Sequence, residues 1–180
     1  MGGQTAQISS YTLRPLERRD LPAFRAIRLE SLRLHPEAFG TAEEEESALS
    51  DRAFARLIPT PPGLYLGAFA RTGSALPALV GVAGLQVPSR VKRRHKGFIF
   101  GVYVRAAHRR NGVARMLLGS LLEESARIGL TVVQLSVTAG NDRAMRLYES
   151  LGFRPFGTEH RALRVGNAYY DETLMEILLH

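Results

Sequence analysis

The sequence predicts a mixed α/β fold, in which helices pack on the faces of a β-sheet. Three observations support this prediction. Strand-like apolar segments recur along the chain, amphipathic segments of helical period lie between them, and Gly, Pro, Asn or Asp stands at most of the joints. A chain of 180 residues fits one domain. We therefore expect a single domain over residues 1–180, with residues 1–10 as a flexible N-terminal tail.

The N-terminal third begins with an expected strand, Tyr11–Pro15, and continues into helices. Asp20 is a suitable N-cap for the first helix, and His35-Pro36 ends it because proline disfavours helical backbone in the residue before it. The acidic run Glu43–Glu46 is typical of a helix N-terminus, where it complements the helix dipole. It predicts a second helical stretch that ends before Pro59.

Three strands are expected in the middle of the chain: Leu64–Ala70, Leu79–Val87 and Gly97–Val104. A turn rich in Gly, Ser and Pro separates the first two strands. The basic run Arg90–Lys96, RVKRRHK, lies between the second and third strands, and we interpret it as the tip of a hairpin.

The strongest helical pattern of the chain is Gly112–Ile128, with Gly129 at the position of a C-cap. Its apolar face is formed by Ala114, Leu117, Leu118, Leu121, Leu122 and Ile128. The β-branched segment Val132–Thr138 is then expected as a strand.

The last part of the chain predicts a short helix and two strands. Asn141 or Asp142 caps the helix, and Gly152 ends it. The strands are expected near Arg154–Leu163 and Glu172–Leu179. The full order is strand, helices, three strands, helix, strand, helix and two strands.

Composition excludes some classes of mechanism and location. The chain has no cysteine, so it cannot form an acyl-cysteine intermediate, a disulfide or a cysteine-based metal site. No apolar run approaches the length of a membrane span, and the polar N-terminus lacks a signal-peptide core, so we expect a cytoplasmic protein. The net charge of +7 is compatible with an anionic cofactor or nucleic acid, but the basic run has no interleaved aromatic residues.

The segment Val102–Leu118 carries the most informative motif. A strand ends in a basic, glycine-containing turn from which the main helix begins, and Arg109, Gly112 and Ala114 give the spacing R-x-x-G-x-A. Small residues allow a ligand close to the backbone, and the free N–H groups of a helix start bind anions. The P-loop and G-x-G-x-x-G patterns are absent, so this loop predicts a different kind of pyrophosphate site.

A second motif follows one strand later, in the segment 141–153, NDRAMRLYESLGF. Asn141 is interpreted first as a helix N-cap. Tyr148 is either a half-buried helix residue or a proton donor. A phenol with a pKa near 10 can protonate a thiolate whose thiol has a pKa near 8.5, if the site holds the two close together.

Together the two motifs resemble the GNAT-family N-acetyltransferases. HRRNGVA is similar to the family's acetyl-CoA pyrophosphate loop, [QR]-x-x-G-x-[GA], and NDRAMRLYESLGF to its Asn-x-x-Ala-x-x-x-Tyr-x-x-x-Gly-Phe block. The resemblance implies a mostly antiparallel sheet that is splayed in the middle and flanked by helices. It also implies an enzyme that uses acetyl-CoA and no metal, and in which the amine attacks the thioester directly.

The resemblance assigns roles to particular residues. Main-chain groups of the Val102–Val104 strand would hold the pantetheine arm and polarise the thioester carbonyl. Tyr148 would be the general acid. The full cofactor-binding set is Val102, Tyr103, Val104, Arg109, Arg110, Asn111, Gly112, Val113, Ala114, Asn141 and Tyr148.

The chain departs from many family members in its central strand. These members carry a general-base glutamate there, whereas Gly97–Val104 reads GFIFGVYV and has no carboxylate. Freeing a lysine-like amine at neutral pH costs roughly 4 to 5 kcal/mol, and freeing an α-amine about 1 to 1.5 kcal/mol. Either the substrate is a weakly basic amine or the base comes from elsewhere. The candidate bases are Glu30, Glu44, Glu45, His95 and His160.

The segment 35–46, HPEAFGTAEEEE, is expected to shape the acceptor site, with Phe39 and Glu45 on the substrate side. The Tyr169-Tyr170 pair either lines the other wall or packs within the last hairpin, and packing is the favoured interpretation.

The sequence thus predicts an acetyl-CoA-dependent N-acetyltransferase whose acceptor is a small primary amine. A protein or peptide N-terminus, or a lysine, is the alternative acceptor. A non-catalytic acyl-CoA-binding module is the alternative of another class, and a nucleic-acid binder rests on charge alone. No membrane or nucleic-acid partner is expected, and the resemblance is compatible with a homodimer.

Overall fold

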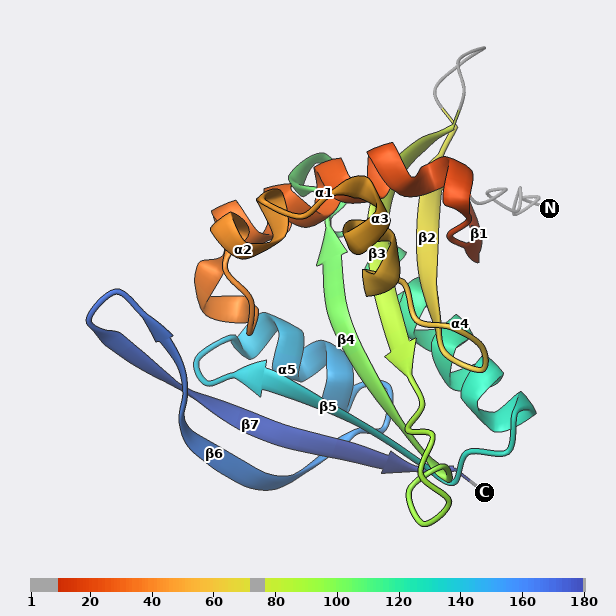
Figure 1. Ribbon diagram of the computed structural model, residues 1–180. Coiled ribbons are helices and arrows are strands. Elements are labelled where there is room, and N and C mark those ends of the chain that lie inside the picture. The colour runs from red at the N-terminus through yellow and green to blue at the C-terminus, as the bar shows by residue number, and fades with distance from the viewer. Residues whose placement is uncertain (1–9, 72–76, 180) are drawn as a thin grey trace, which may run out of the picture.

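The structure is a computed structural model that describes residues 10–71 and 77–179. Its strands form a seven-stranded sheet in the order β1-β2-β3-β4-β5-β7-β6, with helices on both faces (Figure 1). The predicted mixed α/β class and element order are confirmed. The expected N-terminal tail, apart from Ser10, and most of the expected Gly/Ser/Pro turn lie outside the described residues.

The strands and helices have the following bounds: β1 (Tyr11–Pro15), α1 (Leu21–Leu34), α2 (Glu43–Ser47), α3 (Asp51–Phe54), β2 (Leu64–Ala70), β3 (Ala78–Gln86), β4 (Lys96–Val104), α4 (Val113–Arg127), β5 (Val132–Thr138), α5 (Asp142–Glu149), β6 (Arg154–Val165) and β7 (Ala168–Leu178). Short 3₁₀ turns accompany them: η1 (Arg18–Asp20), η2 (Pro36–Ala38), η3 (Ala55–Leu57) and η4 (Ala106–His108).

Two local predictions in the N-terminal third hold only in part. The second helical stretch is broken into α2, α3 and η3, because the Ser50 side chain accepts a hydrogen bond from the Ala53 N–H and so starts a new helix. Asp20 precedes α1 but does not cap it. Its carboxylate accepts hydrogen bonds from the Arg14 guanidinium (2.6 Å) and the Glu17 N–H (2.9 Å) instead.

The final hairpin is longer than its apolar pattern predicts. β6 and β7 are joined by a tight turn at Gly166, which has φ +59°, and they extend to one side of the sheet (Figure 1). The sequence underestimates both strands because most of β6 is exposed on both faces and carries no apolar alternation.

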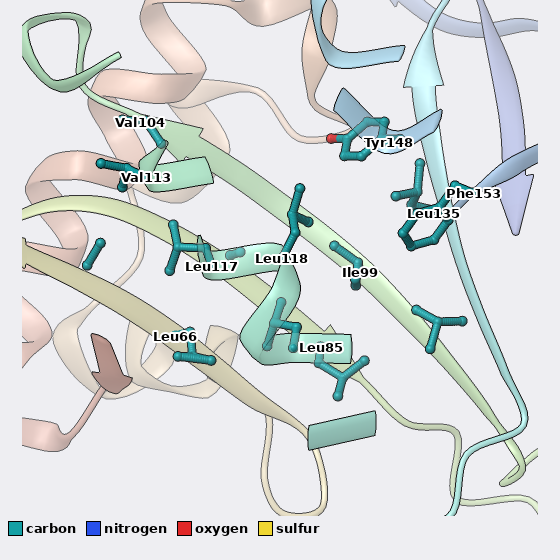
Figure 2. Close-up of a cluster of buried hydrophobic side chains, with 14 of the residues drawn as sticks. Leu66, Leu85, Ile99, Val104, Val113, Leu117, Leu118, Leu135, Tyr148 and Phe153 are labelled. Atoms are coloured by element: carbon teal, nitrogen blue, oxygen red, sulfur yellow. The ribbon is translucent and has the colours of Figure 1, made fainter. Parts of the chain in front are cut away.

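Two apolar layers hold the helices on the sheet. On one face, α1 and α3 contribute Phe24, Ile27 and Phe54, which pack against β2 residues such as Tyr65 and Phe69. On the other face, the fully buried leucines of α4 cover β2 to β4, and α5 contributes Tyr148 (Figure 2). Because the sheet is covered on both faces, β2 and β3 read as almost continuously apolar strands.

The sheet opens between β4 and β5. These are parallel neighbours, whereas the other strand pairs are antiparallel, and their pairing stops at Phe98↔Gln134 while both strands continue (Figure 1). The register of β4 against β3 also shifts, since Gly84 pairs with Phe100 and Val82 with Tyr103. The splayed, mostly antiparallel sheet that the family resemblance implied is therefore present.

Gly101 lies in this register shift with φ +61°. A Cβ atom there would lie 1.9 Å from the Tyr65 hydroxyl, so the close approach of β4 to Tyr65 requires glycine. The irregularity lies in the part of β4 that has left β5.

Candidate functional site

A cavity of about 570 Å³ occupies the gap between β4 and β5. Its size is within the range of small-molecule and cofactor sites. One wall is β4 from Ile99 to Val104, and the opposite wall is formed by the end of β5 with α5. The remaining lining comes from η2, the start of α4 and β7, and it includes Phe39, Arg109, Ala114 and Tyr170.

Tyr148 reaches the cavity from α5. Its side chain is buried against Phe153, with ring centroids 6.1 Å apart, and its hydroxyl points away from Phe153 and Leu135 (Figure 2). The residue is more buried than the sequence predicted. Burial raises the pKa of Tyr148 to about 12, so the hydroxyl keeps its proton at neutral pH and can act as a hydrogen-bond donor.

The loop before α4 has the features of an anion site. Arg110 (φ +65°) and Gly112 (φ +77°) are both left-handed, and a left-handed residue beside extended or right-handed ones turns successive N–H groups toward a common point. No side chain caps α4, whose first N–H groups have no partner within the helix. A Cβ at Gly112 would meet nothing within 4 Å, so the space beside this residue is open.

The Arg109 side chain turns away from this loop. Its Nε donates to the Val104 carbonyl at 2.9 Å, and its Nη2 lies 3.0 Å from His35 Nε2. The guanidinium carbon is 5.6 Å from the centre of the Tyr103 ring. Arg109 therefore connects the end of β4 to η2, and only its backbone belongs to the loop surface.

Tyr103 and Asn141 also have local partners. Tyr103 donates its hydroxyl hydrogen bond to Glu30 (2.9 Å), on the α1 face, and its pKa is raised chiefly by burial and then by this carboxylate. The side-chain oxygen of Asn141 accepts from the Ala144 N–H at 3.2 Å. The N-cap interpretation of Asn141 is confirmed, and the same residue lines the cavity.

Of the two residues predicted on the acceptor side, Phe39 lines the cavity and Glu45 does not. Phe39 lines the cavity, with the Arg28 guanidinium 5.1 Å from its ring centre. Glu45 is exposed, accepts from the Ala42 N–H at 2.9 Å, and is not among the described lining residues. The favoured packing role is wrong for Tyr170, which lines the cavity, while Tyr169 is exposed between Arg161 and Arg164.

Three of the candidate bases have roles elsewhere. Glu30 binds Tyr103 and Arg105, and His160 lies 3.0 Å from Asp171. His95 is in the exposed β3–β4 hairpin, whose position confirms the prediction for the basic run.

Sequence reasoning missed several residues that line the cavity, among them His35 and Glu37. Their Nδ1 and Oε1 atoms lie 3.5 Å apart. The available signal was His-Pro-Glu directly after a helix end, within the segment assigned to the acceptor wall.

The model of the acetyltransferase (GNAT) family matches residues 23–153, most of the chain and the whole of this cavity except Tyr170. The chain belongs to the GNAT family. It is therefore an N-acetyltransferase, and the family's co-substrate is acetyl-CoA. The left-handed loop and uncapped helix start fit the pyrophosphate of that co-substrate.

Individual relatives agree with this GNAT assignment. The chain is 40% identical over 119 residues to the N-alpha-acetyltransferase RimI of Mycobacterium tuberculosis, a match that covers 64% of this chain and 68% of that protein. It is 32% identical over 79 residues to the [ribosomal protein bS18]-alanine N-acetyltransferase of Salmonella typhimurium, covering 44% and 53% of the two chains.

A solved structure is similar over nearly the full length. The GCN5-related N-acetyltransferase from Kribbella flavida superposes with a TM-score of 0.78 at 26% identity, over 94% of this chain and 98% of that one. Within the described residues, no helix has the length and apolar character needed to span a membrane.

Proposed function

We propose that this GNAT enzyme acetylates the N-terminal α-amine of a protein or peptide. The observation that carries the proposal is the 40% identity to an enzyme named as an N-alpha-acetyltransferase. A second relative is named for the alanine of a ribosomal protein. These relatives support the alternative acceptor of the sequence analysis better than its first choice, a small free amine.

Acid–base chemistry supports the same acceptor. At neutral pH, removing a proton from an α-amine costs about 1 to 1.5 kcal/mol, against roughly 4 to 5 kcal/mol for a lysine-like amine. Because β4 has no carboxylate to take this proton, the site is better suited to an amine that costs less free energy to deprotonate. An α-amine acceptor therefore needs less help from a general base than a lysine-like amine.

The acceptor enters, in this proposal, between η2 and β7. Phe39 directly follows η2 and Tyr170 lies on β7, and both would contact the first side chain of the peptide. Acetyl-CoA, when bound, supplies the acetyl group as a thioester. Backbone groups of Arg110 to Ala114 hold its pyrophosphate, and the protonated Tyr148 hydroxyl donates to its sulfur.

The test is a panel of acceptors with acetyl-CoA, read out by release of free thiol. Short peptides with N-terminal Ala, the same peptides with a blocked N-terminus and an internal Lys, free alanine and simple polyamines are compared at equal concentration. The proposal expects the highest kcat/KM for free N-terminal peptides and no acetylation of the blocked ones. A higher kcat/KM for free amino acids or polyamines would replace it with the small-amine acceptor.

A further inference from the structure

The cavity contains one feature that its family membership leaves unexplained. β4 offers no carboxylate, yet a protonated amine must lose a proton before it can attack. Of the described residues that line the cavity, only Glu37 carries a carboxylate. It comes from η2, the short turn that follows α1.

Glu37 is held in position by contacts to other elements. The Thr138 hydroxyl, at the end of β5, donates to the Glu37 carbonyl at 2.7 Å. Within the turn, the Ala38 N–H donates to the His35 carbonyl at 2.9 Å. The backbone of Glu37 is thus fixed across the opening of the sheet rather than carried on a free loop.

The imidazole of His35 is oriented by Arg109. A guanidinium can only donate, so the 3.0 Å contact between Arg109 Nη2 and His35 Nε2 requires Nε2 to accept. The ring proton is then on Nδ1, and Nδ1 faces Glu37 Oε1 at 3.5 Å. Arg109 is itself fixed by its bond to the Val104 carbonyl, so the chain of contacts runs from β4 to the carboxylate.

We propose that Glu37 is the general base of the acetyl transfer, and that His35 and Arg109 are positioning residues that orient it. This rests on N-acetylation, which family membership establishes, and on no particular class of amine. One of the two protons that the ammonium loses passes to Glu37 and then to solvent. The nitrogen lone pair forms the C–N bond as the C–S bond breaks. The sulfur takes a proton from Tyr148, and the second ammonium proton restores that phenol.

The other titratable or charged side chains described around the cavity are two arginines, three tyrosines and one histidine. Those that line the cavity with Glu37 are His35 on its own turn, Arg109 before α4, Arg143 and Tyr148 on α5, Tyr103 on β4 and Tyr170 on β7. No second carboxylate among the described lining residues can take over the proton, so one substitution is enough to remove the base.

The pH dependence of the Glu37→Gln variant tests the proposal. We expect kcat/KM to fall about 10²-fold near pH 6.5, because the variant depends on amine that is already free. Since that fraction rises about tenfold per pH unit below the pKa of the amine, the deficit shrinks as pH rises. Glu37→Asp keeps a base and should retain the shape of the wild-type profile at a lower rate. A Glu37→Gln profile parallel to wild type, or unchanged activity, overturns the proposal.

Matched controls separate this result from misfolding and from the choice of acceptor. Glu123→Gln makes the same change on the exposed face of α4 and should match wild type. Acetyl-CoA binding by calorimetry reports the fold of each variant. The profile is measured with the best acceptor of the panel, whether peptide or small amine. Preference for a small amine would therefore refute the proposed acceptor and leave the test of Glu37 intact.

Discussion

Arg28 and Glu46 form a buried ion pair between α1 and α2. Arg28 Nη2 lies 2.7 Å from Glu46 Oε1, with only 11% and 4% of the two side chains exposed. The Arg28 Nε also donates to the same carboxylate, at 2.9 Å. Since the Arg28 guanidinium also lies over the ring of Phe39, the pair supports a wall of the cavity. The acidic run of α2 is thus more than a complement to the helix dipole.

Breaking this pair should strongly destabilise the protein. Glu46→Ala leaves a buried, unpaired guanidinium, and we expect the free energy of unfolding to fall by about 3 to 5 kcal/mol. Glu43→Ala, on the same helix, removes only a surface pair with Arg33 at 3.9 Å and should cost less than about 1 kcal/mol. Urea denaturation of both variants measures the difference, and equal losses would contradict the assignment.

Gly101 should tolerate no side chain. Gly101→Ala places a Cβ 1.9 Å from the Tyr65 hydroxyl at φ +61°, so we expect a loss of about 2 kcal/mol or more and weaker acetyl-CoA binding. The control, Gly119→Ala, lies inside α4 with no atom within 4 Å of the new Cβ. It should raise the melting temperature, because alanine favours a helix interior by about 0.5 to 1 kcal/mol. If Gly101→Ala left the free energy of unfolding unchanged, β4 would have to move away from Tyr65 to accommodate the new Cβ, and the prediction would be wrong.

Tyr148→Phe should affect turnover and leave binding intact. Removing the proton donor is expected to lower kcat about 10²-fold, while the calorimetric affinity for acetyl-CoA stays near wild type. Because burial raises the pKa of Tyr148 to about 12, its deprotonation should give no alkaline limb in the kcat profile below about pH 10. Unchanged kcat in the variant would remove Tyr148 from the chemistry.

Arg109→Lys tests whether the Arg109 side chain orients His35 or contacts the pyrophosphate of acetyl-CoA. A lysine keeps the charge but cannot reach both the Val104 carbonyl and His35 with a planar fork. We expect acetyl-CoA affinity within about threefold of wild type and kcat/KM about tenfold lower, as for one lost charge-assisted hydrogen bond. ¹⁵N NMR of the His35 ring should also show loss of the single Nδ1–H tautomer. A large loss of acetyl-CoA affinity with unaltered His35 signals would instead indicate that the Arg109 side chain contacts the pyrophosphate directly.

The Arg14–Asp20 pair should make stability depend on pH. The side-chain hydrogen bond from Arg14 is the largest cause that lowers the pKa of Asp20 in the folded protein. A lowered folded pKa stabilises the protein above the unfolded value, about 3.9, and this stability is lost as pH falls through the folded pKa. Asp20→Asn should therefore cost about 1.5 to 3 kcal/mol at pH 7, and the cost should shrink as pH falls through the folded pKa of Asp20.

The control for this pH dependence is Asp51→Asn, whose side chain is 86% exposed beside Arg25. It should change the free energy of unfolding by less than about 1 kcal/mol at either pH. Urea denaturation at pH 7 and at low pH measures both variants. An Asp20→Asn cost that is the same at the two values would refute the ionic contribution.

The sequence by itself determined the elements and the donor-side motif. β1, β2 and β5 have the predicted bounds, and α4 begins directly after the predicted glycine, because apolar periodicity, caps and turn residues are local signals. The pyrophosphate loop is local too, since it needs only a left-handed glycine and a helix start. Its spacing to Tyr148 was enough to suggest the family that the matched model then established.

Only the tertiary structure decided which side chains share the cavity. Glu37 and Thr138 are 101 residues apart, and His35 and Arg109 are 74 apart, so no sequence window contains either pair. The same holds for Glu46, which looks like any other acid of its run until Arg28 is packed against it. Long-range packing decides the strand pairing, the splay of β4 from β5 and the burial of charges. The same packing turned Arg109 inward and brought Glu37 to the cavity.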